Sequence, residues 1–437
     1  MTERQQALLS SNLRRRDFLR SFGAAVGGLA ITRLPIPRGA VSAAATDPPK
    51  LSHMPTIGLL LPRSGINPRF AGSMTAGFKL CLDRAGSGGC YDPGKLKIEE
   101  VGTRPSEAVM MAKSLILDRK VDILVGVMNP VVATDLHDIL ESSRTFLILA
   151  DAGANIVRET EKSPYVFHHT LGYWQSNLAL GEWSVRNLGK KVFVASSFYE
   201  SGYDALYAFR LGVERAGGRV LQTYISHVPP DRMDMLRLMG AIRDARPELV
   251  FASYSGEEAV DFARAFSGSA SVGQIPLVGS SFMADEDLLG NFGAATLGMR
   301  SCFSWAPGLR ISENESFESG FQKITGRAAD SFAVLGYDTG RLIVEALNAT
   351  GGDLANPPRV REAFRGAKFR GPRGVIRMNP ESHSTTMPLY LREVRLNGAS
   401  VANRVVDELK PASENDRAVA ALRDEVRTGW LNAYLNV

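Results

Sequence analysis

"TIGLLLP", residues Thr56 to Pro62, is a continuous apolar run of strand length. A strand at the centre of a parallel sheet is covered on both faces, and it therefore needs such a run rather than an alternating one. Downstream of it, Phe70, Met74, Phe78 and Leu82 recur every four residues, which is the apolar stripe of a helix. "LKIEEV" then supplies a second strand. The stretch predicts a strand–helix–strand unit.

The same alternation continues along the chain. Further strands are predicted at 121–127, 145–150, 191–196, 219–225 and 248–254, and helices at 105–120, 129–142, 174–188, 202–216 and 233–245. Strands and helices at this spacing require right-handed crossovers, so we expect parallel sheets with helices on both faces. The fold class is α/β. The alternation of strands and helices continues for longer than a single sheet needs, and the roughly 390 residues after the N-terminal segment exceed one ordinary domain. We therefore expect two lobes.

The N-terminus combines basic residues with a short uncharged run. In "NLRRRDFLRSFGAAVGGLAIT" (Asn12 to Thr32), four arginines precede residues 21–32, which carry no charge. That run is too short for a membrane-spanning helix, which needs about 20 residues. With the small residues at 40–45, it predicts an export signal peptide over residues 1–45. The alternative is a basic arm that binds nucleic acid or anionic lipid, followed by a linker.

The order Arg15-Arg16-Asp17-Phe18-Leu19-Arg20 resembles the bacterial twin-arginine consensus. That resemblance implies export of an already folded protein by the twin-arginine translocase. No cysteine follows the apolar run until Cys81, so we expect no lipid anchor and a soluble periplasmic product.

The excess of basic over acidic residues lies in the predicted signal peptide. The whole chain has 51 Lys+Arg and 46 Asp+Glu, but residues 1–45 contain seven arginines and two acids, which leaves 44 of each in the remainder. A neutral mature protein offers no basic face, so no nucleic-acid partner is expected. Cys81 and Cys90 are close in sequence. This spacing is compatible with a disulfide between the two, and equally with two free, partly buried thiols.

The sequence lacks the common enzyme motifs. It has no P-loop, no G-x-S-x-G elbow, no H-E-x-x-H and no C-x-x-C. "GSGG" at 86–89 follows a predicted helix rather than a strand, so it indicates a helix end and not a dinucleotide site. The adjacent His168 and His169 would point to opposite faces of a strand, which is unsuitable for one metal. These observations favour binding over catalysis, with no cofactor and no metal.

Four segments together resemble the type I periplasmic binding proteins of ABC importers, the leucine/isoleucine/valine-binding family. They are "IGLLLPRSGINPRFAGSMTAGFKLCLDRAGSGG", "AKSLILDRKVDILVGVMNPVVATDLHDILESSRTFLILADAGA", "KVFVASSFYESGYDALYAFRLGVERAGGRV" and "PELVFASYSGEEAVDFARAF". The resemblance implies a two-lobed fold that closes about a hinge on a small ligand. It implies lobe one at 54–170 plus 302–376 and lobe two at 171–301 plus 377–410.

By the same resemblance, ligand contacts are expected in the loops that follow the strands, where free N–H groups attract a carboxylate. Ser64 belongs to the family's "SG" turn, Asn129 stands in its serine-rich loop, and Ala152, Gly153 and Ala154 replace its Ser-Ala-Thr. The acid that pairs with an α-ammonium would fall near Ser281, where no acid stands; Asp285 or Glu286 would compensate only with a shifted loop.

Aromatic residues gather at the same predicted loops. Tyr173, Trp174, Phe198, Tyr199, Tyr203 and Tyr254 are the residues concerned. Such walls suit a planar or aromatic acid better than a branched-chain amino acid. The expected ligand-binding residues are Ser64, Asn129, Ala152, Gly153, Ala154, Trp174, Tyr199, Tyr203, Tyr254 and Ser281.

The C-terminal residues 411–437 extend beyond the family core as a predicted helix from Glu414, with Ala418, Leu422, Val426 and Trp430 on one stripe. We expect this helix to dock on the parent domain rather than to form a dimer contact, and the protein to be a monomer.

The leading function is delivery of a small carboxylate-bearing ligand to the membrane permease of an ABC importer. A ligand sensor for a signalling receptor and an exported enzyme are the alternatives.

Overall fold

The computed structural model describes residues 54–63, 67–86, 92–102, 104–126, 130–158, 163–227 and 232–411, together with residues 419, 430 and 434. Residues 1–43 form a unit separate from residues 44–437. The predicted signal peptide and most of the predicted C-terminal helix lie outside the described residues. Within the described part, no helix has both the length and the apolar character that crossing a membrane requires.

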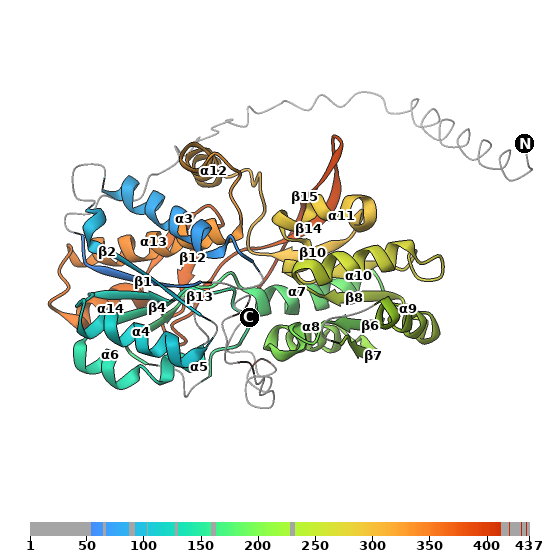
Figure 1. The fold of residues 1–437 in the computed structure, drawn as a ribbon, viewed down its shortest axis with the longest axis horizontal. Coiled ribbons are helices and arrows are strands. Elements are labelled where there is room, and N and C mark those ends of the chain that lie inside the picture. Colours follow the sequence, from blue (N-terminus) through green and yellow to red (C-terminus); the bar gives the residue numbers. More distant parts are fainter. Residues whose placement is uncertain are drawn as a thin grey trace, which may run out of the picture. The chain divides into compact units, whose positions relative to one another are not determined.

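The first sheet is entirely parallel and has the strand order β2-β1-β3-β4-β5. Its strands are β1 (Ile57–Pro62), β2 (Leu96–Val101), β3 (Ile123–Gly126), β4 (Phe146–Leu149) and β5 (Val166–His168). Every residue of β1, β3 and β4 is buried, because helices cover both faces of the sheet (Figure 1). The apolar run at 56–62 is therefore a central strand, as predicted.

The helices of this lobe divide between the two faces. On one face α3 (Phe70–Ala85) and α13 (Ser331–Thr350) pack with the side chains of Leu59, Leu61 and Val125. On the other face α4 (Pro105–Leu117), α5 (Pro130–Thr134) and α6 (His137–Ser143) pack with Leu60 and Leu124. Alternate residues of one strand thus serve two separate cores.

The second sheet has the order β15-β14-β10-β9-β8-β6-β7 and is parallel except at β14 and β15. Its strands are β6 (Lys191–Ser196), β7 (Arg219–Ile225), β8 (Leu249–Ser253), β9 (Leu277–Gly279), β10 (Arg300–Phe303), β14 (Leu389–Asn397) and β15 (Ser400–Leu409). Helices α7 (Tyr173–Asn187) and α8 (Asp204–Arg215) cover one face, whereas α9 (Arg232–Ala245), α10 (Gly256–Gly268) and α11 (Glu286–Phe292) cover the other.

A small antiparallel sheet and several short helices complete the described part. They are β11 (Lys368–Gly371), β12 (Gly374–Met378), β13 (Thr385–Thr386), α12 (Ser312–Thr325), α14 (Pro357–Arg365), η1 (Pro93–Lys95), η3 (Glu200–Gly202), η4 (Ser281–Ala284) and η5 (Gly293–Thr296). The two large sheets and their helices confirm the predicted α/β class and two-lobed architecture.

Two details differ from the sequence prediction or complete it. The single helix predicted at 129–142 is two helices, α5 and α6, because the N–H groups of Asp135 and Leu136 bond three residues back, to Val132 and Ala133, and tighten the turn. Cys81 is a free, buried thiol on α3, which supports the free-thiol alternative over the disulfide. Cys90 lies outside the described residues. Burial raises the pKa of the Cys81 thiol.

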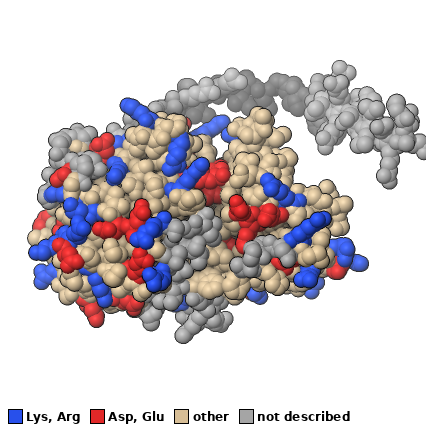
Figure 2. All heavy atoms as spheres, viewed as in Figure 1, with Lys and Arg blue, Asp and Glu red and all other residues tan. Residues whose placement is uncertain are grey.

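Charged side chains of both signs are interspersed over the face of the molecule shown in Figure 2. This mixture agrees with the neutral balance counted for the chain without its leader.

Candidate functional site

The candidate site is built from segments that follow the parallel strands of the second sheet. The carboxyl ends of such strands meet at one sheet edge, which is where α/β proteins bind ligands. Residues 197–203 follow β6, residues 254–255 follow β8, and η4 follows β9. The first turn of α7 lies with them, since the Tyr173 hydroxyl reaches both Glu200 of η3 and Ser253 of β8.

Five aromatic rings form a compact group, which we call the aromatic cluster: Tyr173, Tyr199, Tyr203, Phe282 and Tyr434. The ring of Tyr434 has centroid distances of 4.9 Å to Tyr173, 5.7 Å to Tyr199, 5.1 Å to Tyr203 and 5.0 Å to Phe282. These distances lie in the range of attractive ring pairs. The predicted aromatic residues thus include three members of this cluster, Tyr173, Tyr199 and Tyr203, but sequence reasoning missed Phe282 and Tyr434.

Glu200 is a buried acid at the base of the aromatic cluster. Its Oε2 accepts a hydrogen bond of 2.7 Å from the Tyr173 hydroxyl and one of 3.4 Å from Ser253 Oγ, and its Oε1 accepts one from the Tyr434 hydroxyl. Burial raises the pKa of Glu200, and the donated hydrogen bonds oppose that rise. Sequence reasoning missed this residue, although its place next to Tyr199 after a buried strand was a usable indication.

The loop after β4 contacts the start of α7 through its backbone. The carbonyl oxygens of Ala152 and Gly153 accept hydrogen bonds from the N–H groups of Tyr173 (3.0 Å) and Trp174 (2.9 Å). Gly153 has φ +73° and its N–H donates to Asp151 Oδ1 at 2.7 Å. The N–H groups of Tyr173 and Trp174, the first two residues of α7, are therefore used within the protein.

This loop also joins segments that are distant in sequence. The carbonyl of Ala154 accepts from the N–H of Ala205 at 2.9 Å, and the N–H of Ile156 donates to Asp204 Oδ2 at 2.9 Å. Burial raises the pKa of Asp151 to about 7, against the lowering effect of the Gly153 N–H.

The other predicted site residues have varied positions. Trp174 is buried in the same core as the aromatic cluster. Tyr254 belongs to the core on the opposite face of the second sheet, where it stacks on Phe262 at 4.8 Å and its hydroxyl lies 2.7 Å from Ser226 Oγ. Ser281 donates its hydroxyl to the carbonyl of Cys302 at 2.7 Å. Ser64 and Asn129 lie outside the described residues.

The two acids weighed as partners of an ammonium group differ in state. Glu286 Oε1 accepts a 2.7 Å hydrogen bond from Asn403 Nδ2 and lies 3.6 Å from Arg392 Nη1, so it already has a cation beside it. Burial, with Asp287 and Glu286 nearby, raises the pKa of Asp285 to about 8. Asp285 is therefore mostly uncharged at neutral pH.

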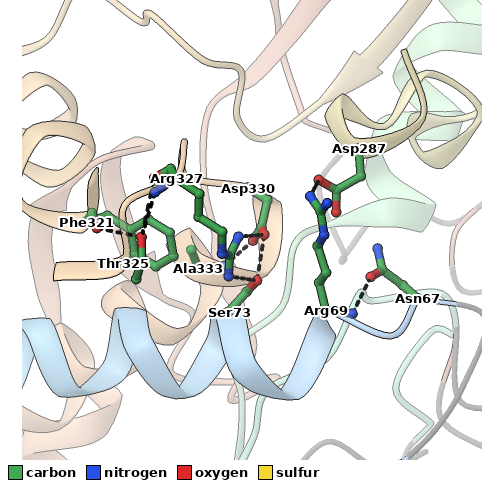
Figure 3. Close-up of polar contacts among 9 residues, drawn as sticks. All are labelled: Asn67, Arg69, Ser73, Asp287, Phe321, Thr325, Arg327, Asp330 and Ala333. Carbon is green, nitrogen blue, oxygen red and sulfur yellow. Dashed lines mark hydrogen bonds and ion pairs between the residues drawn. The ribbon is translucent and has the colours of Figure 1, made fainter. Parts of the chain in front are cut away.

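Asp285 lines a cavity of about 300 Å³ between the N-terminal end of α3 and the elements α10 and α11. Figure 3 shows the ion pair beside it, in which Arg69 Nη1 lies 2.7 Å from Asp287 Oδ1. The same view shows Asp330, whose Oδ2 accepts from Ser73 Oγ at 2.6 Å and from Arg327 at 2.9 Å. The Arg69–Asp287 and Ser73–Asp330 contacts connect residues more than 200 positions apart and hold α3 beside α11 and α13.

His168 and His169 are both buried, and burial lowers the pKa of each. Across the described ranges, no three His, Cys, Asp or Glu side chains come together in a way that would hold a metal ion.

Comparisons with known proteins agree with this architecture. Residues 55–399 match the family model described as periplasmic binding protein. A "Leu/Ile/Val-binding protein homolog 6" of Brucella melitensis is 30% identical over 295 residues, which are 66% of this chain and 74% of the relative. An ABC transporter substrate-binding protein from Sphaerobacter thermophilus is 27% identical with a TM-score of 0.74, over 81% of this chain and 97% of its own.

A solute-binding protein of an ABC transporter from R. palustris, solved in complex with benzoate, is also 27% identical. Its TM-score is 0.67, over 82% of this chain and 96% of its own. The family match covers most of the chain, and the two sheets have the topology described above. The chain thus belongs to the periplasmic binding protein family, as a two-lobed solute-binding protein of the ABC-transporter type and not an enzyme.

Proposed function

We propose that this protein captures a small aromatic or other non-amino carboxylic acid between its lobes and delivers it to the permease of an ABC importer. The observation that carries the proposal is the aromatic cluster at the strand-end loops, with the buried Glu200 beneath it. Aromatic walls bind a planar ring by stacking and apolar burial, which do not depend on charge. The benzoate complex of the R. palustris relative is consistent with such a ligand.

The acids Glu200, Asp285 and Glu286 are poor partners for an α-ammonium group. Glu286 is paired with Arg392, the pKa of Asp285 is raised to about 8, and Glu200 already accepts hydrogen bonds from tyrosine hydroxyls. Burying a cation without a charged partner costs a few kcal/mol of binding free energy. We assign the ligand carboxylate to the loops that contain Ser64 and Asn129, and the ring to the side of Trp174, Tyr199 and Tyr203.

Calorimetry on the purified protein tests the ligand class. We expect benzoate to bind more tightly than leucine or valine, and Tyr203→Ala to weaken benzoate binding by about 1–3 kcal/mol. Tyr165→Ala is the matched control, because Tyr165 packs against Phe146 in the first lobe. Submicromolar leucine binding that Tyr203→Ala leaves unchanged would overturn both the ligand class and the proposed wall.

We also propose that the twin-arginine translocase exports the protein to the periplasm and that a peptidase releases it between about residues 43 and 48. The support is the order of residues 15–20 and the alanines that follow the apolar run. Replacing Arg15 and Arg16 together with lysine, which keeps the charge, should abolish accumulation in the periplasmic fraction on immunoblots. Normal periplasmic amounts of that variant would contradict this export route.

We also propose that the protein acts as a monomer with its first lobe boundary at 170/171. The boundaries expected at 301/302 and 376/377 fall inside β10 and β12, so we place them just after these two strands. The first boundary is supported by the separate sheets, since the strands of the first sheet end at His168 and those of the second begin at Lys191.

A further inference from the structure

Tyr434 lies in the middle of the aromatic cluster rather than at its edge. Its side chain is 3% exposed, and the four other rings of the cluster all lie within 5.7 Å of its centroid. Those four rings come from α7, η4 and the β6–α8 connection, which are parts of the second lobe. Tyr434 instead comes from beyond β15, the last strand of the fold.

The Tyr434 hydroxyl satisfies one oxygen of the buried Glu200 carboxyl group. Tyr173 and Ser253 donate to the other oxygen, Oε2, and Tyr434 donates to Oε1. Burial and the nearby Glu200 raise the pKa of Tyr434 well above its ordinary value, so the phenol keeps its proton and donates it. A buried carboxyl oxygen that lost this donor would need another one in the same place.

Trp430, four residues before Tyr434, anchors this end of the chain beside the aromatic cluster. Its Nε1–H donates to the carbonyl of Tyr199 at 2.9 Å, and its ring meets the edge of Phe198 at 5.5 Å. Gly202 makes room for the indole, because a Cβ at that position would lie 1.4–2.0 Å from the indole atoms of Trp430.

We propose that Tyr434 occupies the ligand chamber as an internal competitor, and that the ligand which displaces it carries a phenolic hydroxyl to replace its bond to Glu200. The inference rests on the proposed function for the ligand class and for the chamber, but the position of Tyr434 among the four rings stands on contacts of its own. Replacing Tyr434 by the ligand changes the free energy little, because the burial of one ring and one charge-assisted hydrogen bond to Glu200 are lost with Tyr434 and regained with the ligand.

Titration calorimetry of 4-hydroxybenzoate and benzoate against the full chain tests the competition. Tyr434→Ala removes the competitor, and Gly202→Ala dislodges Trp430 without changing any ring of the cluster. We expect each variant to bind 4-hydroxybenzoate at least about tenfold more tightly than the wild type, since a competing state lowers apparent affinity by its own population. Tyr434→Ala should also prefer 4-hydroxybenzoate to benzoate.

Gly240→Ala is the matched control, because a Cβ there meets nothing within 4 Å. It should bind as the wild type does. Equal or weaker binding of 4-hydroxybenzoate by Tyr434→Ala would overturn the competition and make Tyr434 a wall of the site instead.

Nitration of tyrosines by tetranitromethane, read by mass spectrometry of the C-terminal peptide, separates this inference from the proposed function. Tyr434 should resist nitration in the ligand-free protein and become reactive when 4-hydroxybenzoate is bound. Nitration of Tyr434 in the ligand-free protein as fast as in urea would overturn the occupancy. If no variant binds either acid, the proposed ligand class fails, and protection of Tyr434 still supports its place in the chamber.

Discussion

Replacing Arg373 with methionine should lower the free energy of unfolding by about 3–5 kcal/mol, which is the cost of leaving one member of a buried ion pair alone. Arg373 and Asp338 are both fully buried, and Arg373 Nε donates to Asp338 Oδ2 at 2.7 Å. Burial raises the pKa of Asp338, and the Arg373 guanidinium opposes that rise. Without the guanidinium, the buried carboxyl group would lose its hydrogen-bonded cation and keep only the weaker influence of Arg341.

The same guanidinium joins segments that are distant in sequence. Nη1 donates to the carbonyl of Thr170 at 2.7 Å and lies 3.4 Å from Ser304 Oγ. Nη2 lies 2.8 Å from His169 Nε2. Burial and Arg373 lower the pKa of His169 well below its ordinary value, so the neutral ring accepts this hydrogen bond.

Urea unfolding at neutral pH measures the effect, with Arg370→Met as the matched control. Arg370 stands on β11, three residues before Arg373, but its side chain is 55% exposed and pairs with Glu313 at the surface, so its loss should cost less than about 1 kcal/mol. The double variant Arg373→Met/Asp338→Asn should be more stable than Arg373→Met alone, because it removes the stranded carboxylate. A loss below about 1 kcal/mol for Arg373→Met would refute this account of the junction.

Gly336→Leu should destabilise the protein by about 3 kcal/mol or more, although leucine is the better helix former. Helices α3 and α13 touch along their backbones: a Cβ on Gly336 would lie 2.1 Å from the carbonyl oxygen of Met74, and one on Gly77 would lie 1.9 Å from that of Ala333. The helices would have to move apart, and the core beneath them would lose its packing.

Gly240→Leu on α9 separates helix propensity from packing. A Cβ there has open space, so this variant should gain about 0.5–1 kcal/mol. Thermal unfolding of both variants should therefore give shifts of opposite sign. Equal Tm values for Gly336→Leu and the wild type would show that the two helices do not approach as described.

In the second lobe, α7 and α8 also touch along their backbones at glycine positions. A Cβ on Gly181 would lie 2.3 Å from the carbonyl oxygen of Phe209, and one on Gly212 would lie 2.1 Å from that of Leu178. The helix that begins at the aromatic cluster is thus held against α8 at backbone distance. This close packing fixes Tyr173 relative to Tyr203, which stands just before α8.

The sequence by itself determined the α/β class, the two lobes and most strands of the parallel sheets, since a strand covered on both faces must be a continuous apolar run. Predicted strands at 191–196 and 219–225 coincide with β6 and β7. Strands after residue 254 were not predicted. β14 is buried in its first four residues but exposed in its last three, and β15 is largely exposed, so neither is the continuous apolar run by which the other strands were predicted.

Only the tertiary structure decided which side chains meet at the site. Glu200 and Tyr434 are separated by 234 positions, and Arg373 and His169 by 204. Neither pair leaves a local pattern, because a hydrogen bond between distant segments depends on how lobes and chain ends pack and not on the spacing of neighbours. Tyr254 shows the converse: it follows β8 as Tyr199 follows β6, yet it packs in the core on the other face of the second sheet. Periodicity identifies which residues are buried, whereas packing decides what each buried residue touches.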